Sequence, residues 1–137
     1  MAEAKTRELI EDFLKKGPYA VVGASTDRGK YGNKVLRAYL QNDKKVYPIN
    51  PKAQEVEGRK AYPDLSSLPE TPRGVSIITP PKITEEVVLQ AAEAGAEFVW
   101  MQPGAQSDEA VRRAKEKGLK VIADGSCALV AMGFREG

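Results

Sequence analysis

A glycine-rich turn with hydroxyl and cationic side chains joins a short apolar run to a segment that suits a helix. The apolar run is Tyr19–Val22, and the turn spans residues 23–32 with Ser25, Arg28 and Lys30 in it. In a parallel α/β sheet, such a turn directs backbone N–H groups at an anion where the next helix begins. The turn lacks the G-x-G-x-x-G spacing of a dinucleotide fingerprint, so a tight connection without ligand remains the alternative.

A lysine follows the second apolar run, in the sequence Pro48-Ile-Asn-Pro-Lys52. At the tip of this strand an NAD-binding domain carries an acidic residue for the ribose hydroxyls. Lys52 would attract a phosphorylated ribose, which an acid would repel. An exposed turn with a solvated lysine is the alternative interpretation, and the preceding anion-type turn favours the ligand.

Two further loops follow apolar runs, namely Thr79-Pro80-Pro81 and Gln102-Pro103-Gly104. Prolines are tolerated where a helix starts, so the first loop has a plain structural explanation. Two prolines also form a stiff apolar wall for a ligand. Both explanations stay open for both loops.

Apolar runs alternate with amphipathic segments along the chain. The expected strands are Tyr19–Val22, Lys45–Ile49, Val75–Ile78, Phe98–Met101 and Leu119–Ala123, with helices between them and one before the first. This alternation predicts a Rossmann-like α/β fold, an open parallel five-stranded sheet of order 3-2-1-4-5 with helices on both faces. The polar loops all follow strands, so they should converge at the carboxyl ends of the sheet.

Several local features give the expected boundaries of helices. Thr84 is the predicted N-cap of the helix that Gly95 ends, and Ser107 is the predicted N-cap of the next helix. Residues 52–73 contain glycine and several prolines, which predicts a loop with one short helical turn near Asp64–Leu68.

Length and charge bound the class of protein. The chain has 137 residues with a net charge of +2, which predicts a single domain, residues 1–137, with residues 1–17 as a helix packed on it. So small a charge argues against nucleic acid or an acidic membrane as partners. No apolar stretch is long enough to span a membrane and no signal-peptide core is present, so the cytoplasm is the expected location.

The chain has no histidine and only one cysteine, so it lacks the side chains most often used as catalytic bases and metal ligands. No metal site is predicted, and no catalytic residue is assigned, because the commonest base and metal ligand are missing. The sequence favours Cys127 as a small buried apolar residue rather than a reactive thiol. Trp100 is expected in the core.

Five motifs and a cysteine occur together in a familiar order: Gly23-Ala-Ser25 with Lys30-Tyr-Gly32, Tyr47-Pro-Ile-Asn-Pro-Lys52, Ile78-Thr-Pro-Pro81, Gln102-Pro-Gly104 and Cys127. The chain thereby resembles the small stand-alone CoA-binding domain proteins, over about Ile10 to Gly133. That family is similar to the CoA-binding N-terminal domain of the succinyl-CoA synthetase α subunit. The chain has Asp124-Gly-Ser-Cys127 where the family more typically has Asp-Arg-Cys.

The resemblance implies coenzyme A or an acyl-CoA as the cofactor. The implied diphosphate turn includes Gly23 and Arg28, Lys52 would face the ribose 3′-phosphate, and Thr79 would help to wall the adenine or pantetheine. The full set of implied binding residues is Gly23, Ala24, Ser25, Arg28, Lys30, Tyr31, Gly32, Asn50, Pro51, Lys52, Thr79, Pro80, Pro81, Gln102, Pro103 and Gly104. The synthetase uses a phosphohistidine, which a chain without histidine cannot form.

Three hypotheses follow. The first is a non-catalytic CoA-binding protein that acts as a sensor, a carrier or the subunit of a protein partner. The second is an NADP-binding oxidoreductase or redox-sensing domain, which would use the same turn and the same lysine. The third is an interaction module whose pocket stays empty.

Overall fold

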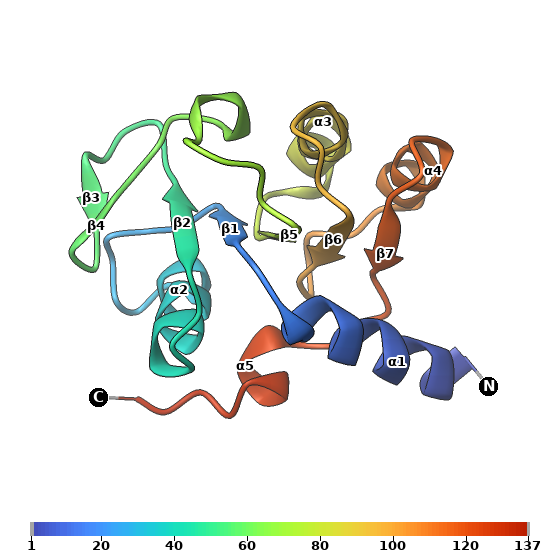
Figure 1. Ribbon diagram of the computed structural model, residues 1–137, viewed down its shortest axis with the longest axis horizontal. Coiled ribbons are helices and arrows are strands. Elements are labelled where there is room, and N and C mark those ends of the chain that lie inside the picture. The colour runs from blue at the N-terminus through green and yellow to red at the C-terminus, as the bar shows by residue number, and fades with distance from the viewer. Residues whose placement is uncertain (1, 137) are drawn as a thin grey trace.

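A computed structural model describes residues 2–136, in which helices alternate with strands (Figure 1). In chain order the elements are α1 (Ala2–Lys15), β1 (Tyr19–Val22), α2 (Tyr31–Gln41), β2 (Val46–Ile49), β3 (Glu55–Val56), β4 (Arg59–Lys60), η1 (Leu65–Ser67), β5 (Gly74–Ile77), α3 (Pro81–Glu93), β6 (Phe98–Met101), α4 (Asp108–Glu116), β7 (Lys120–Ile122) and α5 (Ala128–Ala131). Within this part of the chain, no helix combines the length and apolar character that a membrane crossing requires.

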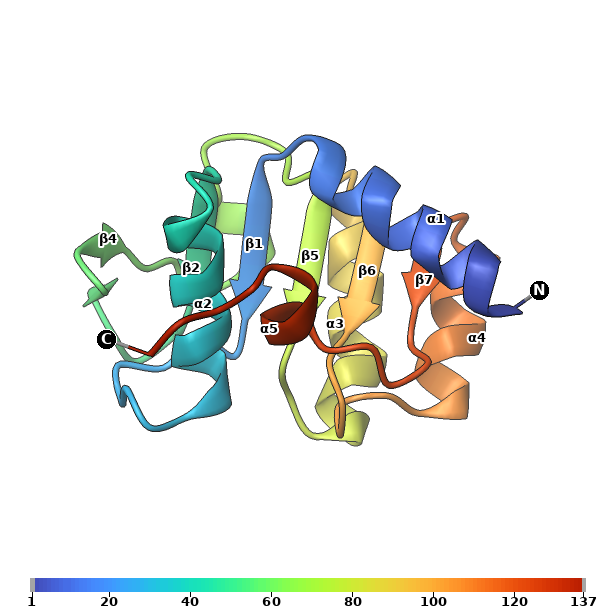
Figure 2. The ribbon, with the colours of Figure 1, turned by 90° about the horizontal axis from the view of Figure 1, so that it is seen from below.

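Five parallel strands form the main sheet, and β1, β5 and β6 are seen to point the same way in Figure 2. The Rossmann-like α/β class is confirmed, but the predicted strand order 3-2-1-4-5 is wrong. The order is β2-β1-β5-β6-β7, and Val22 lies opposite Ile77. The third expected strand pairs with β1 instead, and the outer edge of β2 at Pro48 and Asn50 is bonded to Tyr62. The Tyr62 N–H donates to Pro48 O at 3.0 Å, and its carbonyl accepts from the Asn50 N–H at 2.9 Å.

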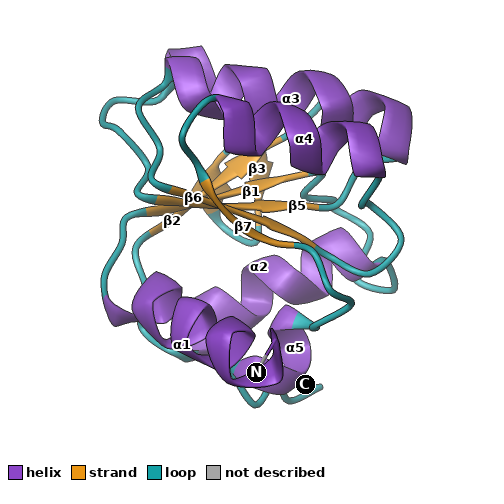
Figure 3. Ribbon diagram, turned by 90° about the vertical axis from the view of Figure 1, so that its right-hand side faces the viewer, coloured by secondary structure: helices purple, strands orange, loops and turns teal. Residues whose placement is uncertain are grey.

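The observed order decides which loops face one another. In an open parallel sheet, the binding crevice lies where successive connections leave to opposite faces. Here α2 follows β1 on one face and α3 follows β5 on the other (Figure 3). The crevice therefore lies between β1 and β5, and it brings the turn at Gly23 next to the loop at Thr79.

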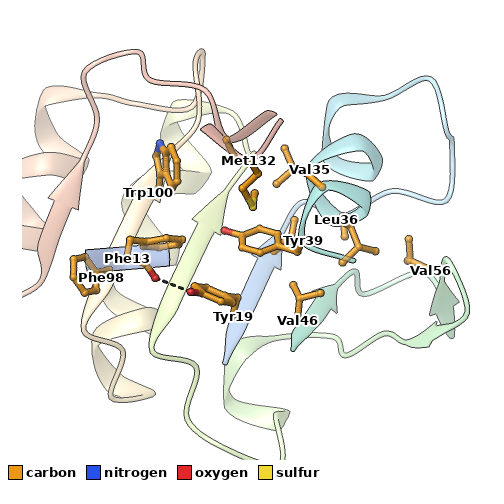
Figure 4. Packing of buried hydrophobic residues seen from close by; sticks show 14 of the residues in the cluster. Phe13, Tyr19, Val35, Leu36, Tyr39, Val46, Val56, Phe98, Trp100 and Met132 are labelled. Atoms are coloured by element: carbon orange, nitrogen blue, oxygen red, sulfur yellow. Dashed lines mark hydrogen bonds between the residues drawn. The ribbon is translucent and has the colours of Figure 1, made fainter. Parts of the chain in front are cut away.

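Alternate strand residues supply two apolar cores. Helices α1, α2 and α5 cover one face, whereas α3 and α4 cover the other (Figure 3). On the α1 side, the Phe13 ring lies 5.2 Å from the rings of Tyr19 and Trp100, and Trp100 is fully buried as predicted (Figure 4). The Tyr19 hydroxyl also donates to Phe13 O at 2.7 Å, which fixes α1 to the sheet.

The helix boundaries confirm two predicted caps and correct a third. The Ser107 side chain accepts from the Ala110 N–H and begins α4, and Gly95 follows α3 with φ of +88°. Thr84 is not an N-cap, because α3 begins three residues earlier at Pro81, whose ring favours helical φ. Thr84 is buried instead, and its hydroxyl bonds to the Thr79 hydroxyl at 2.7 Å.

The segment between β2 and β5 contains a small hairpin that the sequence reading missed. Strands β3 and β4 pair antiparallel and lie beyond β2, at the left of Figure 1. Their turn places Glu57 and Gly58 at φ of +51° and +76°, as a type I′ turn requires. Glutamate is unusual there, so the turn lacks the usual Asn-Gly signal. The predicted helical turn is confirmed as η1, Leu65–Ser67.

Candidate ligand-binding site

Two glycines hold the turn after β1 against its neighbours. Gly23 has φ of +98°, and a Cβ atom there would lie 2.1 Å from Ile78 O. A Cβ atom on Gly32 would lie 2.0 Å from Gly23 O. The backbone of the turn lies directly against both α2 and the segment that leaves β5. A side chain therefore fits at neither position. Close backbone approach is the purpose that glycines serve in dinucleotide-binding turns.

The N-terminus of α2 presents free backbone donors beside this turn. Its N-cap residue, Lys30, makes no side-chain capping bond, and the first turn carries no acidic residue. The Lys34 N–H donates to Lys30 O at 3.2 Å, which leaves the N–H groups of residues 31–33 without partners inside the helix. These donors and the helix dipole together suit an anion.

Two buried polar side chains of α2 preform the turn. Asn33 Nδ2 donates to Ser25 O at 2.9 Å and to the Glu57 carboxylate at 3.0 Å. Arg37 Nε donates to Asn33 Oδ1 at 2.7 Å, and Arg37 Nη2 donates to Arg28 O at 2.9 Å. Sequence reasoning missed this pair. In the sequence, the two residues are recognisable only as polar side chains four residues apart on one helix. The same spacing is typical of polar residues on the exposed face of a helix.

The turn and the Lys52 loop line one pocket with a volume of about 400 Å³. Asn50 connects them, because its Nδ2 donates to Ala24 O at 2.9 Å and its Oδ1 accepts from the Lys52 N–H at 2.8 Å. The lining residues are Val22, Gly23, Ala24, Ile49, Asn50, Pro51, Lys52, Pro63, Asp64, Thr79, Ile83, Val87 and Gln90. Of the predicted binding residues, Gly23, Ala24, Asn50, Pro51, Lys52 and Thr79 thus lie together.

The pocket combines an apolar floor with one charge of each sign. Val22, Ile49 and Val87 are buried hydrophobic residues, while Lys52 is exposed. Asp64 was not among the predicted binding residues, and hydrogen bonds from serines of η1 hold the pKa of its carboxyl below the usual range. A lysine suits a phosphate and a carboxylate suits ribose hydroxyls, so the pair fits a phosphorylated nucleoside.

The remaining predicted residues lie outside the lining of this pocket: Ser25, Arg28, Lys30, Tyr31, Gly32, Pro80, Pro81, Gln102, Pro103 and Gly104. Pro80 is the N-cap of α3 and Pro81 is its first residue, so both prolines start a helix. The Arg28 guanidinium lies 3.6 Å from the Glu57 carboxylate of the hairpin turn. The residues at 30–32 form the start of α2, as described above.

A phenol, an amide and a thiol meet beside the first turn of α2. The Tyr31 hydroxyl donates to Gln102 Oε1 at 3.1 Å and lies 2.7 Å from Cys127 Sγ. Burial, then the hydrogen bond with Cys127, raises the pKa of the Tyr31 phenol. Gln102 Oε1 also accepts from the Ala128 N–H at 2.8 Å, whereas its buried Nε2 has no partner among residues 2–136. Cys127 is half-buried, rather than the buried apolar residue that the sequence favours.

Metal-ligating side chains do not cluster in the part of the chain that the structure describes. No group of three or more Cys, Asp or Glu residues there could hold a metal ion. The polar groups at the carboxyl ends of the strands are instead backbone N–H donors, one lysine and one carboxylate acceptor. Such a set is compatible with an organic anion at the carboxyl ends of the strands of an open α/β domain.

The chain belongs to a family of CoA-binding domains. A family model described as "CoA binding domain" matches residues 18–132, which includes β1 and all of the loops described above. This result confirms the family that the sequence motifs indicate.

Similar proteins include both longer ligases and small proteins. The α subunit of the ADP-forming acetate–CoA ligase II of Pyrococcus furiosus is 30% identical over 66% of this chain, which spans only 20% of that subunit. Protein YneT of Bacillus subtilis is 30% identical, with 90% of this chain and 92% of YneT covered. The structure of a hypothetical protein from Pyrococcus horikoshii OT3 matches with a TM-score of 0.85 and 35% identity, covering 91% and 87% of the two chains.

Proposed function

We propose that this protein binds coenzyme A or an acyl-CoA at the carboxyl ends of β1, β2 and β5. The observation that carries this proposal is the shared pocket. The turn at Gly23 and the cation of Lys52 line one cavity, and Asn50 hydrogen-bonds to both loops. Membership of the CoA-binding domain family supports coenzyme A over other phosphorylated nucleosides.

The residues fit the separate parts of this cofactor. Lys52 would contact the ribose 3′-phosphate, and Asp64, which lines the same pocket, would accept from a ribose hydroxyl. The diphosphate would receive the N–H groups at the start of α2, where the glycines exclude side chains. The pantetheine arm would then extend toward Tyr31 and Gln102, where a buried amide donor has no partner within residues 2–136.

The proposed role is binding without catalysis, as a sensor, a carrier or the subunit of a partner protein. A chain without histidine cannot form the phosphohistidine of a synthetase. The P. furiosus relative is named as the α subunit of an acetate–CoA ligase, which supports a partner protein for this chain. We place the protein in the cytoplasm, where a free half-buried thiol such as Cys127 stays reduced.

Titration calorimetry with CoA, acetyl-CoA, dephospho-CoA and NADPH tests the proposal. We expect CoA to bind, and dephospho-CoA to bind about tenfold more weakly because it loses one charge-assisted contact with Lys52. NADPH carries its ribose phosphate on the 2′ hydroxyl, whereas CoA carries it on the 3′ hydroxyl. NADPH should therefore bind more weakly than CoA. Tighter binding of NADPH would overturn the proposal in favour of the oxidoreductase alternative. If none of the four ligands binds, the pocket is not a CoA site.

A further inference from the structure

A second pocket lies on the outer edge of the sheet, away from the carboxyl ends of the strands. It has a volume of about 500 Å³, and we call it the edge pocket. The N-terminal half of β2, the end of α2 and residues around β4 form it, in the region at the left of Figure 1. Its lining shares no residue with the pocket at Gly23.

Positive charge is concentrated in the edge pocket. Its charged lining residues are Lys44, Lys45, Arg59, Lys60 and Asp43. The four cations exceed the one acid by three, which is more than the +2 net charge of the entire chain. Lys45 pairs with a glutamate outside the lining, but the ion pairs among residues 2–136 include neither Arg59 nor Lys60, and both are exposed. Two cations are therefore available to an acidic partner.

Two tyrosine rings hold lysines at this pocket. The Tyr47 and Tyr62 rings meet edge to face, with centroids 5.7 Å apart. Lys60 Nζ lies 5.2 Å from the Tyr62 centroid, and Lys45 Nζ lies 5.9 Å from the Tyr47 centroid. Contact with the Tyr62 ring keeps the Lys60 ammonium near the pocket, so a ligand need not order that side chain. Lys45 is also held by its ion pair with Glu70.

The backbone of β2 offers hydrogen-bonding groups at the same place. β2 is the outermost strand, and successive residues of a strand direct their N–H and C=O groups to opposite sides. Pro48 O and the Asn50 N–H point outward, because both bond to Tyr62. Val46, two residues before Pro48, therefore directs its N–H and C=O outward as well, and it lines the edge pocket although only 6% of the residue is exposed.

We propose that the edge pocket binds an extended acidic segment of a partner protein, which adds as a short strand to the N-terminal half of β2. The outward groups of Val46 would bond to the backbone of the segment, and its carboxylates would contact Arg59 and Lys60. Strand addition at an open edge is a common mode of peptide recognition. The unpaired backbone groups favour a peptide over a free anion, which would use the cations alone. The inference does not depend on CoA binding, because it uses none of the residues in that pocket.

Binding of a model peptide tests the inference. The probe is a labelled heptapeptide of alternating glutamate and valine, measured by fluorescence anisotropy at low salt. The test variant is Arg59→Glu with Lys60→Glu, and the matched control is Lys115→Glu with Lys117→Glu, two exposed lysines at the end of α4. We expect the test variant to bind at least about tenfold more weakly than the natural protein, and the control to bind within about twofold.

Amide exchange distinguishes a strand from a loosely held anion. The peptide should slow hydrogen exchange at the Val46 amide, whereas tripolyphosphate, the free-anion probe, should not. If tripolyphosphate displaces the peptide and the Val46 amide is unprotected in both complexes, the site is an anion site and the inference is wrong. Unchanged peptide binding by the folded test variant also overturns it. Should the double variant fail to melt cooperatively, Lys60→Glu alone provides the same comparison at one exposed position.

Discussion

The two ends of the parallel sheet differ in whether their charged and polar groups have partners. At the amino end, Arg73 donates to Asp12 at 2.7 Å and to Glu97 at 3.1 Å, and Lys120 Nζ lies 3.0 Å from Glu97. Both cations also lie over the Phe98 ring, at 4.9 and 5.1 Å from its centroid. These charges satisfy one another.

At the carboxyl end, donors remain without partners within residues 2–136. Lys52 makes no ion pair there, the first turn of α2 has no capping side chain, and Gln102 Nε2 is unbonded. The paired charges hold α1 against the sheet and contribute stability. The unpaired donors contribute little to stability and leave interactions for a ligand to complete. We therefore expect changes at the amino end to affect stability alone.

Gly23→Ala should have the largest effect, because the new Cβ atom would meet Ile78 O at 2.1 Å with φ at +98°. We expect a loss of at least about 3 kcal/mol in the free energy of unfolding, together with loss of CoA binding. Urea denaturation and calorimetry measure the two. Gly58→Ala is the control, since Gly58 also has positive φ but open space around it, and it should cost only about 1 kcal/mol. Equal losses for both variants would contradict the role given to close packing.

Arg73→Met should destabilise the amino end without affecting the ligand. The variant removes the bonds to two carboxylates and those from Nη1 to Asp12 O and Lys16 O, at 2.8 and 3.0 Å. We expect a loss of about 2 kcal/mol in the free energy of unfolding, measured with urea. CoA affinity should stay within about twofold of the natural protein. A large loss of affinity would show that the two ends are coupled.

Asn50→Ala should affect both properties, because Asn50 joins the two loops of the proposed site. We expect a loss of about 1 kcal/mol in stability and weaker CoA binding. Asn42→Ala is the matched control. Its Nδ2 bonds to Ala38 O and Met132 O at 2.8 and 3.0 Å, outside the lining of the pocket at Gly23. The control should lose similar stability and keep its affinity for CoA. If it loses affinity too, general loosening of the fold explains both results.

Acidification should weaken the amino end by a smaller amount. The hydrogen bond from Arg73 lowers the pKa of Asp12, and bonds from Lys120 and then Arg73 lower that of Glu97. The unfolded chain thus takes up protons at higher pH than the folded one. The stability from these groups is complete above their ordinary pKa values and is lost as pH falls through the lowered ones. The melting temperature should fall below about pH 5, less steeply for Arg73→Met. An equal slope in both proteins would contradict this.

Local patterns predicted the elements that form the site but not the order of the strands. Short apolar runs and the Ser107 cap depend on neighbours in sequence and are correct in the structure, whereas the predicted Thr84 cap is not. Strand order depends on which edge is free. Tyr62, which follows a hairpin without an Asn-Gly turn, bonds to part of the edge that the prediction gave to the third strand. Handedness of the connections permits either order, so it could not decide between them.

Only some of the residues that line the pocket at Gly23 could be predicted from the sequence. Gly23 and Lys52 follow strands, and parallel strands bring such loops to one edge. Asn33 and Arg37 look like exposed helix residues, since only the folded turn shows which backbone oxygens they meet. Asp64 comes from the long loop, whose path no local pattern defines. The missed residues are those whose role depends on contacts distant in sequence.

The coupling between Lys52 and the 3′-phosphate of coenzyme A would show most directly whether the cofactor lies between Lys52 and the Gly23 turn. Calorimetry would give the affinities of CoA and dephospho-CoA for the natural protein and for Lys52→Ala, with Lys117→Ala as the control lysine. We predict that removing the phosphate weakens binding about tenfold in the natural protein and in the control, and has almost no effect in Lys52→Ala. An equal effect of the phosphate in all three proteins would contradict the placement of the cofactor between Lys52 and the Gly23 turn.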